Sequence, residues 1–164
     1  MNNPSLNGSK TAQNLEAAFA GESMANRKYL YFAKLARELG NTEVADLFED
    51  IAQQETGHAF AHLQLMFPKE GLTVEKLLEI ARDGELYETN EMYPGFEKQA
   101  LEEGNTAAVA EFKEQAAESL EHANIFNRAA RRFGALKKVE ALHAAEYDEA
   151  LQNLKAGNAV RQAG

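Results

Sequence analysis

The sequence predicts an all-α protein, and three observations support this fold class. Ala, Glu, Leu, Lys and Gln dominate the composition, and all of them favour the helix. Only three prolines occur in 164 residues, so long uninterrupted helices are possible. No segment shows the sustained alternation of apolar and polar residues that a half-buried strand requires. The length corresponds to one domain or at most two small ones.

The first half of the chain reads as a tail followed by two helices. Residues 1–10 have the composition of a flexible tail, and a helix is predicted over 11–39. Gly40-Asn41 then forms a turn, because glycine commonly ends a helix in the left-handed conformation. Thr42 can cap a second helix over 42–66, and the proline and glycine of segment 67–71 end it.

The second half begins with a short helix over 73–81 and a further helix that runs to residue 103 with a kink at Pro94. Gly104-Asn105-Thr106 repeats the punctuation of positions 40–42. From there the pattern is helical to residue 154, with a break expected near Gly134. We therefore expect a helical bundle over 11–155 and a C-terminal tail over 156–164.

The composition excludes several classes of function. Twenty-six acidic residues against seventeen basic ones give a net charge of −9, which argues against nucleic acid or an anionic membrane as a partner. The absence of cysteine excludes thiol catalysis, disulfides and iron–sulfur clusters within these residues. No apolar run has the length of a membrane span, and residues 1–10 lack a signal-peptide core. We expect a soluble, cytoplasmic protein.

Five glutamates and two histidines lie on the apolar faces of the predicted helices, where solvated charges are not expected. They are Glu22, Glu55, His58, Glu85, Glu88, Glu140 and His143. A buried carboxylate without a partner costs several kcal/mol, and a cluster of them adds mutual repulsion. A multivalent cation would neutralise them, and oxygen ligands with one imidazole per ion suit iron or manganese better than zinc or copper.

The spacing of these residues strengthens the metal interpretation. Glu55-x-x-His58 recurs as Glu140-x-x-His143, so the chain reads as two helix pairs with an insertion of about one helix in the second pair. Two Glu helices and two Glu-x-x-His helices form the di-iron carboxylate pattern of four-helix bundles. A single Glu-x-x-His is common by chance, and the alternative is a plain structural bundle. The joint occurrence on four helices favours the metal.

The inserted segment contains a second candidate group at Glu118, Glu121 and His122. His122 follows Gly104 by the same interval that separates His58 from Gly40. The two glutamates point away from the apolar stripe and His122 lies at its border, so we interpret them as solvent-facing. They remain an alternative to Glu140 and His143. His62 shares a face with Glu55 two turns along and is interpreted as a core or supporting histidine.

Four stretches resemble the rubrerythrin family of the ferritin-like superfamily. They are FAGESMANRKYLYFAKLARELG at 19–40, QQETGHA at 53–59, DGELYETNEMYPGF at 83–96 and KKVEALHAAEYDEAL at 137–151. The resemblance covers most of the chain except about twenty residues between 113 and 132. It implies a ferritin-like four-helix bundle with a long crossover and an inserted helical segment before the last ligand-bearing helix.

The resemblance also implies a site and an activity. The seven residues named above would bind two iron ions, with manganese or mixed occupancy as a variant. Glu55 and Glu140 would bridge the ions, and one ion would move between Glu88 and His58 as the redox state changes. Tyr29 and Tyr93 match tyrosines that hydrogen-bond to ligand carboxylates.

The implied reaction is the reduction of hydrogen peroxide to water, in defence against oxidative stress. The chain resembles the short family forms without a rubredoxin domain (erythrin, sulerythrin and symerythrin), so an external donor such as a rubredoxin-like protein is expected. A homodimer is expected, and exchange of helices between subunits is one way to accommodate the insertion. The alternatives are a ferroxidase or iron-storage protein, an oxidase that activates O2, and a structural bundle with vestigial ligands.

Overall fold

The computed structural model describes residues 3–162, with side chains for residues 3–155. Every regular element within 3–162 is helical, which confirms the predicted all-α class. None of the helices in this range has the length and apolar character that a bilayer span requires. The chain packs as two compact units that divide after Leu72, and each unit is described by itself.

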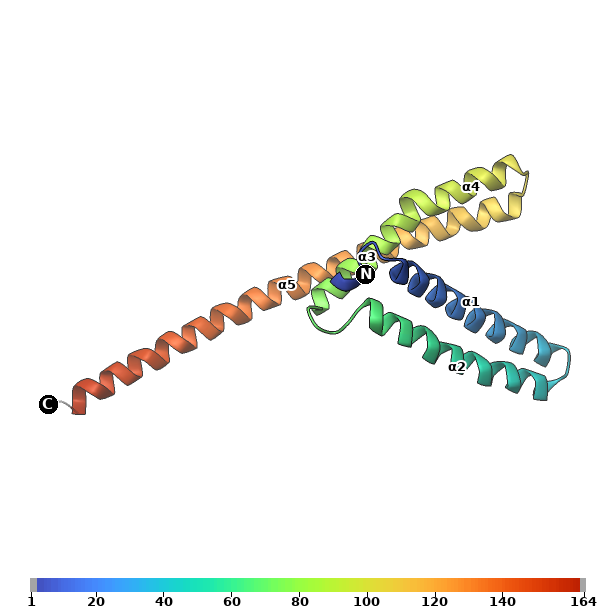
Figure 1. Ribbon diagram of the computed structural model, residues 1–164. Helices are drawn as coiled ribbons and strands as arrows, with labels where there is room; N and C mark the ends of the chain where they lie inside the picture. The colour runs from blue at the N-terminus through green and yellow to red at the C-terminus, as the bar shows by residue number, and fades with distance from the viewer. Residues whose placement is uncertain (1–2, 163–164) are drawn as a thin grey trace. The chain divides into compact units, whose positions relative to one another are not determined.

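Unit 1 is a hairpin of two long antiparallel helices, α1 (Lys10–Glu38) and α2 (Thr42–Met66), as Figure 1 shows. Ser9 caps α1 by accepting a hydrogen bond from the backbone N–H of Ala12 at 3.0 Å. Asn41, one residue before the predicted cap, caps α2 by accepting from the N–H of Val44 at 3.0 Å. Within the predicted tail 1–10, Pro4–Leu6 forms one 3-10 turn, η1.

Small residues let the two helices of unit 1 approach closely. Ala33, Ala45 and Ala52 are 1%, 0% and 0% exposed, so the interface is built on alanine rather than on large side chains. Asn26 ties the helices together, because its Nδ2 donates to the carbonyl oxygen of Ala52 at 2.7 Å and to Thr56 Oγ1 at 3.0 Å. These contacts fix the register in which α1 faces α2.

Unit 2 begins with three consecutive helical elements: α3 (Val74–Tyr87), a π-helical turn η2 (Glu88–Met92) and α4 (Tyr93–Glu102). The short helix predicted over 73–81 does not end there but continues through Gly84 to Tyr87. The irregular turn ends two residues before Pro94, which has no N–H to donate into a regular helix. Pro94 thus produces a widened turn within one helical rod.

The last element, α5 (Thr106–Gln162), is a single helix of 57 residues. The break predicted near Gly134 is wrong, because one glycine costs only about 1 kcal/mol in a helix and strong helix formers flank it. The helix also extends into the predicted tail 156–164, of which residues 163–164 lie outside the described range, as do residues 1–2. The predicted bundle limits at 11 and 155 stay a prediction.

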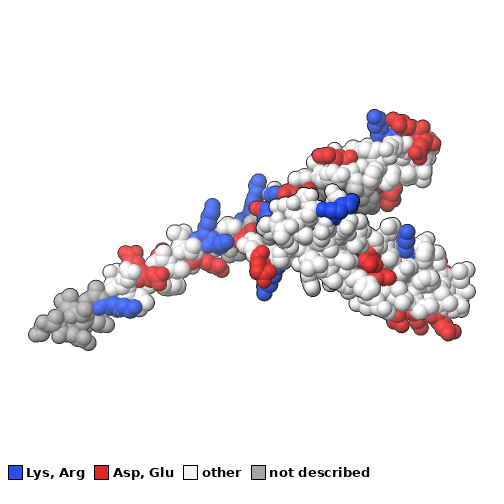
Figure 2. All heavy atoms as spheres, in the orientation of Figure 1, with Lys and Arg blue, Asp and Glu red and all other residues white. Residues whose placement is uncertain are grey.

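The elements α3, η2 and α4 pack along the first half of α5 (Figure 1). Lys137 marks one end of this contact, with its Nζ 3.9 Å from Glu75 Oε1 near the start of α3. Tyr93, Phe96 and Phe112 pack together where α4 meets α5, with ring centroids 5.6 to 6.4 Å apart. Acidic side chains gather near the turn between α4 and α5 in Figure 2, in line with the negative net charge.

Candidate metal centre

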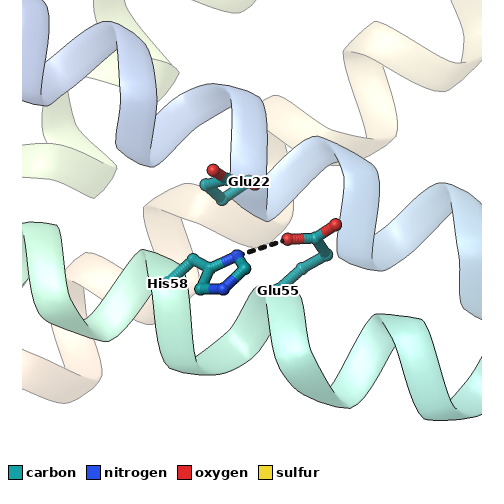
Figure 3. A group of neighbouring side chains, drawn as sticks. All are labelled: Glu22, Glu55 and His58. Carbon is teal, nitrogen blue, oxygen red and sulfur yellow. Dashed lines mark hydrogen bonds and ion pairs between the residues drawn. The ribbon is translucent and has the colours of Figure 1, made fainter.

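Unit 1 brings together three of the predicted ligands, Glu22 from α1 and Glu55 and His58 from α2 (Figure 3). One potential ligand atom from each side chain lies within 4.8 Å of the others. Glu55 and His58 are three residues apart, so they occupy adjacent turns on one face of α2. Glu22 faces them from α1. The spacing predicted from the sequence is therefore realised in three dimensions, and we name these residues the first ligand group.

The electrostatics of the first ligand group suit a divalent cation. Glu22 and Glu55 are half-buried, and no lysine or arginine within residues 3–155 forms an ion pair with either carboxylate. The partner of Glu55 is His58, whose Nδ1 lies 2.8 Å from Glu55 Oε2. This contact orients the imidazole and leaves its Nε2 as a potential ligand. Two carboxylates and one imidazole are a donor set that fits ferrous iron.

Unit 2 places Glu85 of α3 and Glu88 of η2 beside α5, although among the described residues only the first ligand group has three potential ligand atoms within 4.8 Å of one another. Glu85 Oε2 lies 3.5 Å from Nδ1 of His122, and Glu88 Oε2 accepts a hydrogen bond of 2.8 Å from Oγ of Ser119. Ser119 and His122 are three residues apart on α5, the spacing that Glu55 and His58 have on α2. Glu85, Glu88 and His122 again supply two carboxylates and one imidazole, and we name them the second ligand group.

Glu140 and His143 are not brought to Glu85 or Glu88 within unit 2. Both are exposed on α5, beyond the position of Lys137. Because α5 is continuous through Gly134, the twenty-one residues from His122 to His143 correspond to about 30 Å along the helix axis, at roughly 1.5 Å per residue. Their assignment as ligands therefore stays a prediction from the sequence.

The sequence interpretation missed two contacts on α5. His122 was placed at the border of the apolar face, but its ring approaches Glu85. Ser119 is not among the predicted site residues, although it follows Gly104 by fifteen residues, as Glu55 follows Gly40. Glu118 and Glu121 are exposed, and His62 is half-buried on α2 outside the first ligand group. The repeated Gly-Asn-Thr punctuation was the signal that could have identified Ser119 and His122.

The two predicted tyrosines lie in aromatic clusters. Tyr29 packs on Phe48 with ring centroids 5.9 Å apart, and Tyr93 packs on Phe96 and Phe112. Within residues 3–155 neither hydroxyl group hydrogen-bonds to a carboxylate. Burial raises the pKa of Tyr93, and the negative charge of nearby Glu88 raises it further. Tyr93 is therefore a neutral phenol at physiological pH.

Comparison with known proteins identifies a family model, related sequences and solved structures that are similar to this chain. The family model described as Rubrerythrin matches residues 13–130. Nigerythrin of Nitratidesulfovibrio vulgaris is 34% identical over 158 residues, covering 89% of this chain and 68% of that protein. Rubrerythrin-1 of Clostridium acetobutylicum is 33% identical over 162 residues, covering 88% and 79%. The solved structure of fully reduced, all-ferrous nigerythrin is 36% identical, covers 77% of this chain and 69% of that chain, and has a TM-score of 0.39.

The matched range contains both ligand groups and Ser119, and it ends before Glu140 and His143. The match covers more than two-thirds of the 164 residues, so it concerns the chain as a whole and not one motif. It also confirms the ferritin-like helical fold predicted from the sequence. The chain therefore belongs to the rubrerythrin family and is an iron-binding helical protein of that type.

Proposed function

We propose that this protein is a non-haem di-iron peroxidase that reduces hydrogen peroxide to water. The observation that carries the proposal is the presence of two ligand groups, each with two carboxylates and one imidazole, inside the range that matches the rubrerythrin family. Carboxylate-rich donor sets with one imidazole favour iron or manganese. The proposal extends the iron-binding and oxidoreductase character of the family to one reaction.

The proposed ligands are the six residues of the two groups: Glu22, Glu55, His58, Glu85, Glu88 and His122. For the last histidine, the sequence favours His143, whereas the 3.5 Å approach to Glu85 supports His122. We favour His122 because Glu85 already lies beside it without any rearrangement of α5. Iron in both positions is the primary proposal, and manganese in one of them is compatible with the same donors.

When bound, two ferrous ions supply the two electrons that convert one peroxide and two protons into two waters. The chain contributes orientation and charge balance. The carboxylates of each group offset the positive charge of an ion, and the hydrogen bond between Glu55 and His58 holds the imidazole in one orientation. Tyr93 keeps its proton near Glu88 because its pKa is raised, so its phenol is available as a hydrogen-bond donor.

The electrons that return the site to its reduced state must come from outside these residues. The sequence contains no cysteine, so it cannot hold the thiolate-bound iron of a rubredoxin-type relay. We propose a rubredoxin-like donor protein, a cytoplasmic location where such donors are reduced, and a homodimeric assembly. Gel filtration tests the assembly, since a large hollow shell instead of a dimer would support iron storage.

Stopped-flow mixing tests the reaction. The ferrous-loaded protein is mixed with hydrogen peroxide or with oxygen, and its oxidation is followed by absorbance. We expect peroxide to oxidise the protein faster than oxygen, and oxidation that is far faster with oxygen would overturn the peroxidase assignment. His58→Ala should slow the peroxide reaction. His62→Ala is the matched control, because His62 lies on the same helix outside the first ligand group.

A further inference from the structure

Ser119 is the buried polar residue of the described chain, with 5% of its surface exposed within residues 3–155. Its hydroxyl group donates to Glu88 Oε2 at 2.8 Å. A buried hydroxyl needs a hydrogen-bond partner, and a bond to a charged carboxylate is stronger than one between neutral groups. The hydroxyl of Ser119 is therefore committed to Glu88, a residue of the second ligand group.

The internal repeat shows what Ser119 replaces. In each helix pair a Gly-Asn-Thr sequence precedes the second helix, and a histidine follows the glycine by eighteen residues. Three residues before the histidine, α2 has Glu55 and α5 has Ser119. Unit 1 thus presents a carboxylate at this position, whereas unit 2 presents an uncharged hydroxyl.

The two ligand groups nevertheless contain the same kinds of donor, namely two carboxylates and one imidazole. The first takes its carboxylates from Glu22 and Glu55 on opposite helices. The second takes both from one helical rod, at Glu85 and Glu88, and α5 contributes only an imidazole. A glutamate at position 119 would add a third carboxylate to the second group and increase repulsion there. Serine leaves the charge unchanged and can hold the carboxylate that is already present.

We propose that Ser119 is a positioning residue that fixes the Glu88 carboxylate for metal binding in unit 2, in place of a direct carboxylate ligand on α5. This inference rests on the proposed function, because it takes Glu88 as a ligand. The hydrogen bond engages Oε2 of Glu88 and leaves Oε1 as the donor atom for the ion. Glu88 starts the π-helical turn η2, and turns of this kind occur frequently at functional sites.

The turn η2 supplies a matched control. Thr89, the next residue, also reaches α5, since its Oγ1 donates to the carbonyl oxygen of Ala116 at 3.3 Å. Both hydroxyl groups join the same turn to the same helix, but only that of Ser119 touches a ligand carboxylate. A general loosening of η2 should follow from either substitution, whereas loss of carboxylate positioning should follow only from Ser119→Ala.

Anaerobic titration of the metal-free protein with Co²⁺, a spectroscopically visible stand-in for Fe²⁺, tests the proposal. We expect two ions per chain in the unaltered protein. Ser119→Ala should weaken binding of one ion by about tenfold or more and leave the other unchanged, as loss of a supporting hydrogen bond to a ligand does. Ser119→Thr, which keeps the hydroxyl, should restore most of this affinity, and Thr89→Val should leave both ions unchanged.

The outcomes separate this inference from the proposed function. If the unaltered protein binds no Co²⁺, the proposed function is overturned and the inference is overturned with it. If it binds two ions and Ser119→Ala binds both as tightly, only the role of Ser119 is overturned. An equal loss in Thr89→Val would likewise reject positioning, because it would show that packing of η2 alone determines the affinity.

Discussion

Glu22→Gln should have opposite effects on the metal-free and the metal-bound protein. Glu22 and Glu55 place carboxylate oxygens within 4.8 Å, and no lysine or arginine among residues 3–155 forms an ion pair with either of them. Two like charges at 4 Å repel by about 1 kcal/mol in water and by about 4 kcal/mol at an effective dielectric constant of 20. Both side chains are half-buried and in contact with solvent, so the repulsion is about 1 kcal/mol.

The substitution keeps the shape of the side chain and removes its charge. The metal-free protein should therefore gain about 1 kcal/mol, which for a chain of this size raises the Tm by about 2–4 °C. Ferrous iron bound by the first ligand group, at a hundred times its Kd, should add about 2.7 kcal/mol, or about 5–10 °C, to the stability of the unaltered protein. Most of that increase should be absent in Glu22→Gln, because a charged ligand has been lost.

Thermal melts followed by circular dichroism measure both effects, once with a chelator and once with excess Fe²⁺ without oxygen. Glu16→Gln is the control, because Glu16 is an exposed glutamate on the same helix outside the first ligand group. It should change neither the metal-free Tm nor the increase on iron binding. A Glu22→Gln protein that keeps the full increase with iron would refute the assignment of Glu22 as a ligand.

Three further predictions concern packing and pH. Ala52→Leu should cost about 1–3 kcal/mol of unfolding free energy, because Ala52 is fully buried between α1 and α2, and unchanged denaturant unfolding would contradict this packing. Burial, with added charge from Glu88, raises the pKa of Tyr93, so absorbance titration should show a late-ionising tyrosine that Tyr93→Phe removes. The stabilising contribution of Tyr93 should be complete below its unfolded pKa of about 10 and lost as the pH rises through its folded pKa. Hydrogen bonds from its own backbone N–H and from Thr73 lower the pKa of Glu75. The stability that Glu75 contributes should be present above its unfolded pKa of about 4.3 and lost as the pH falls through its folded pKa. Thermal melts from neutral to acidic pH should therefore show a smaller loss of stability in Thr73→Ala than in the unaltered protein.

The helices of unit 1 could be predicted closely from sequence because local signals agree there. Gly40 and Asn41 mark the turn, and the cap differs by one residue because Asn41 and Thr42 are both good caps. The break expected at Gly134 did not occur, because a single glycine is a weak signal within a long run of helix formers. Local propensity could not show that one helix would span 57 residues.

The candidate site was predictable where charge contradicted burial. Glu22, Glu55 and His58 stood out because charged or titratable side chains interrupted an apolar face, and the structure brings them together. Ser119 gave no such signal, because a serine on a helix face is unremarkable in sequence. The element that packs against α5 changes along its length from α4 to η2 and then α3, so the side of α5 that faces its neighbours changes too. A single averaged stripe therefore placed His122 at its border.

Iron content measured after anaerobic loading tests the central claim most directly, namely that both ligand groups bind iron. The metal-free protein is loaded with Fe²⁺, freed of unbound metal and analysed for iron per chain. We predict two ions in the unaltered protein and in His143→Ala, and fewer than two in His58→Ala and in His122→Ala. Only trace iron in the unaltered protein, or a loss in His143→Ala with none in His122→Ala, would contradict the assignment.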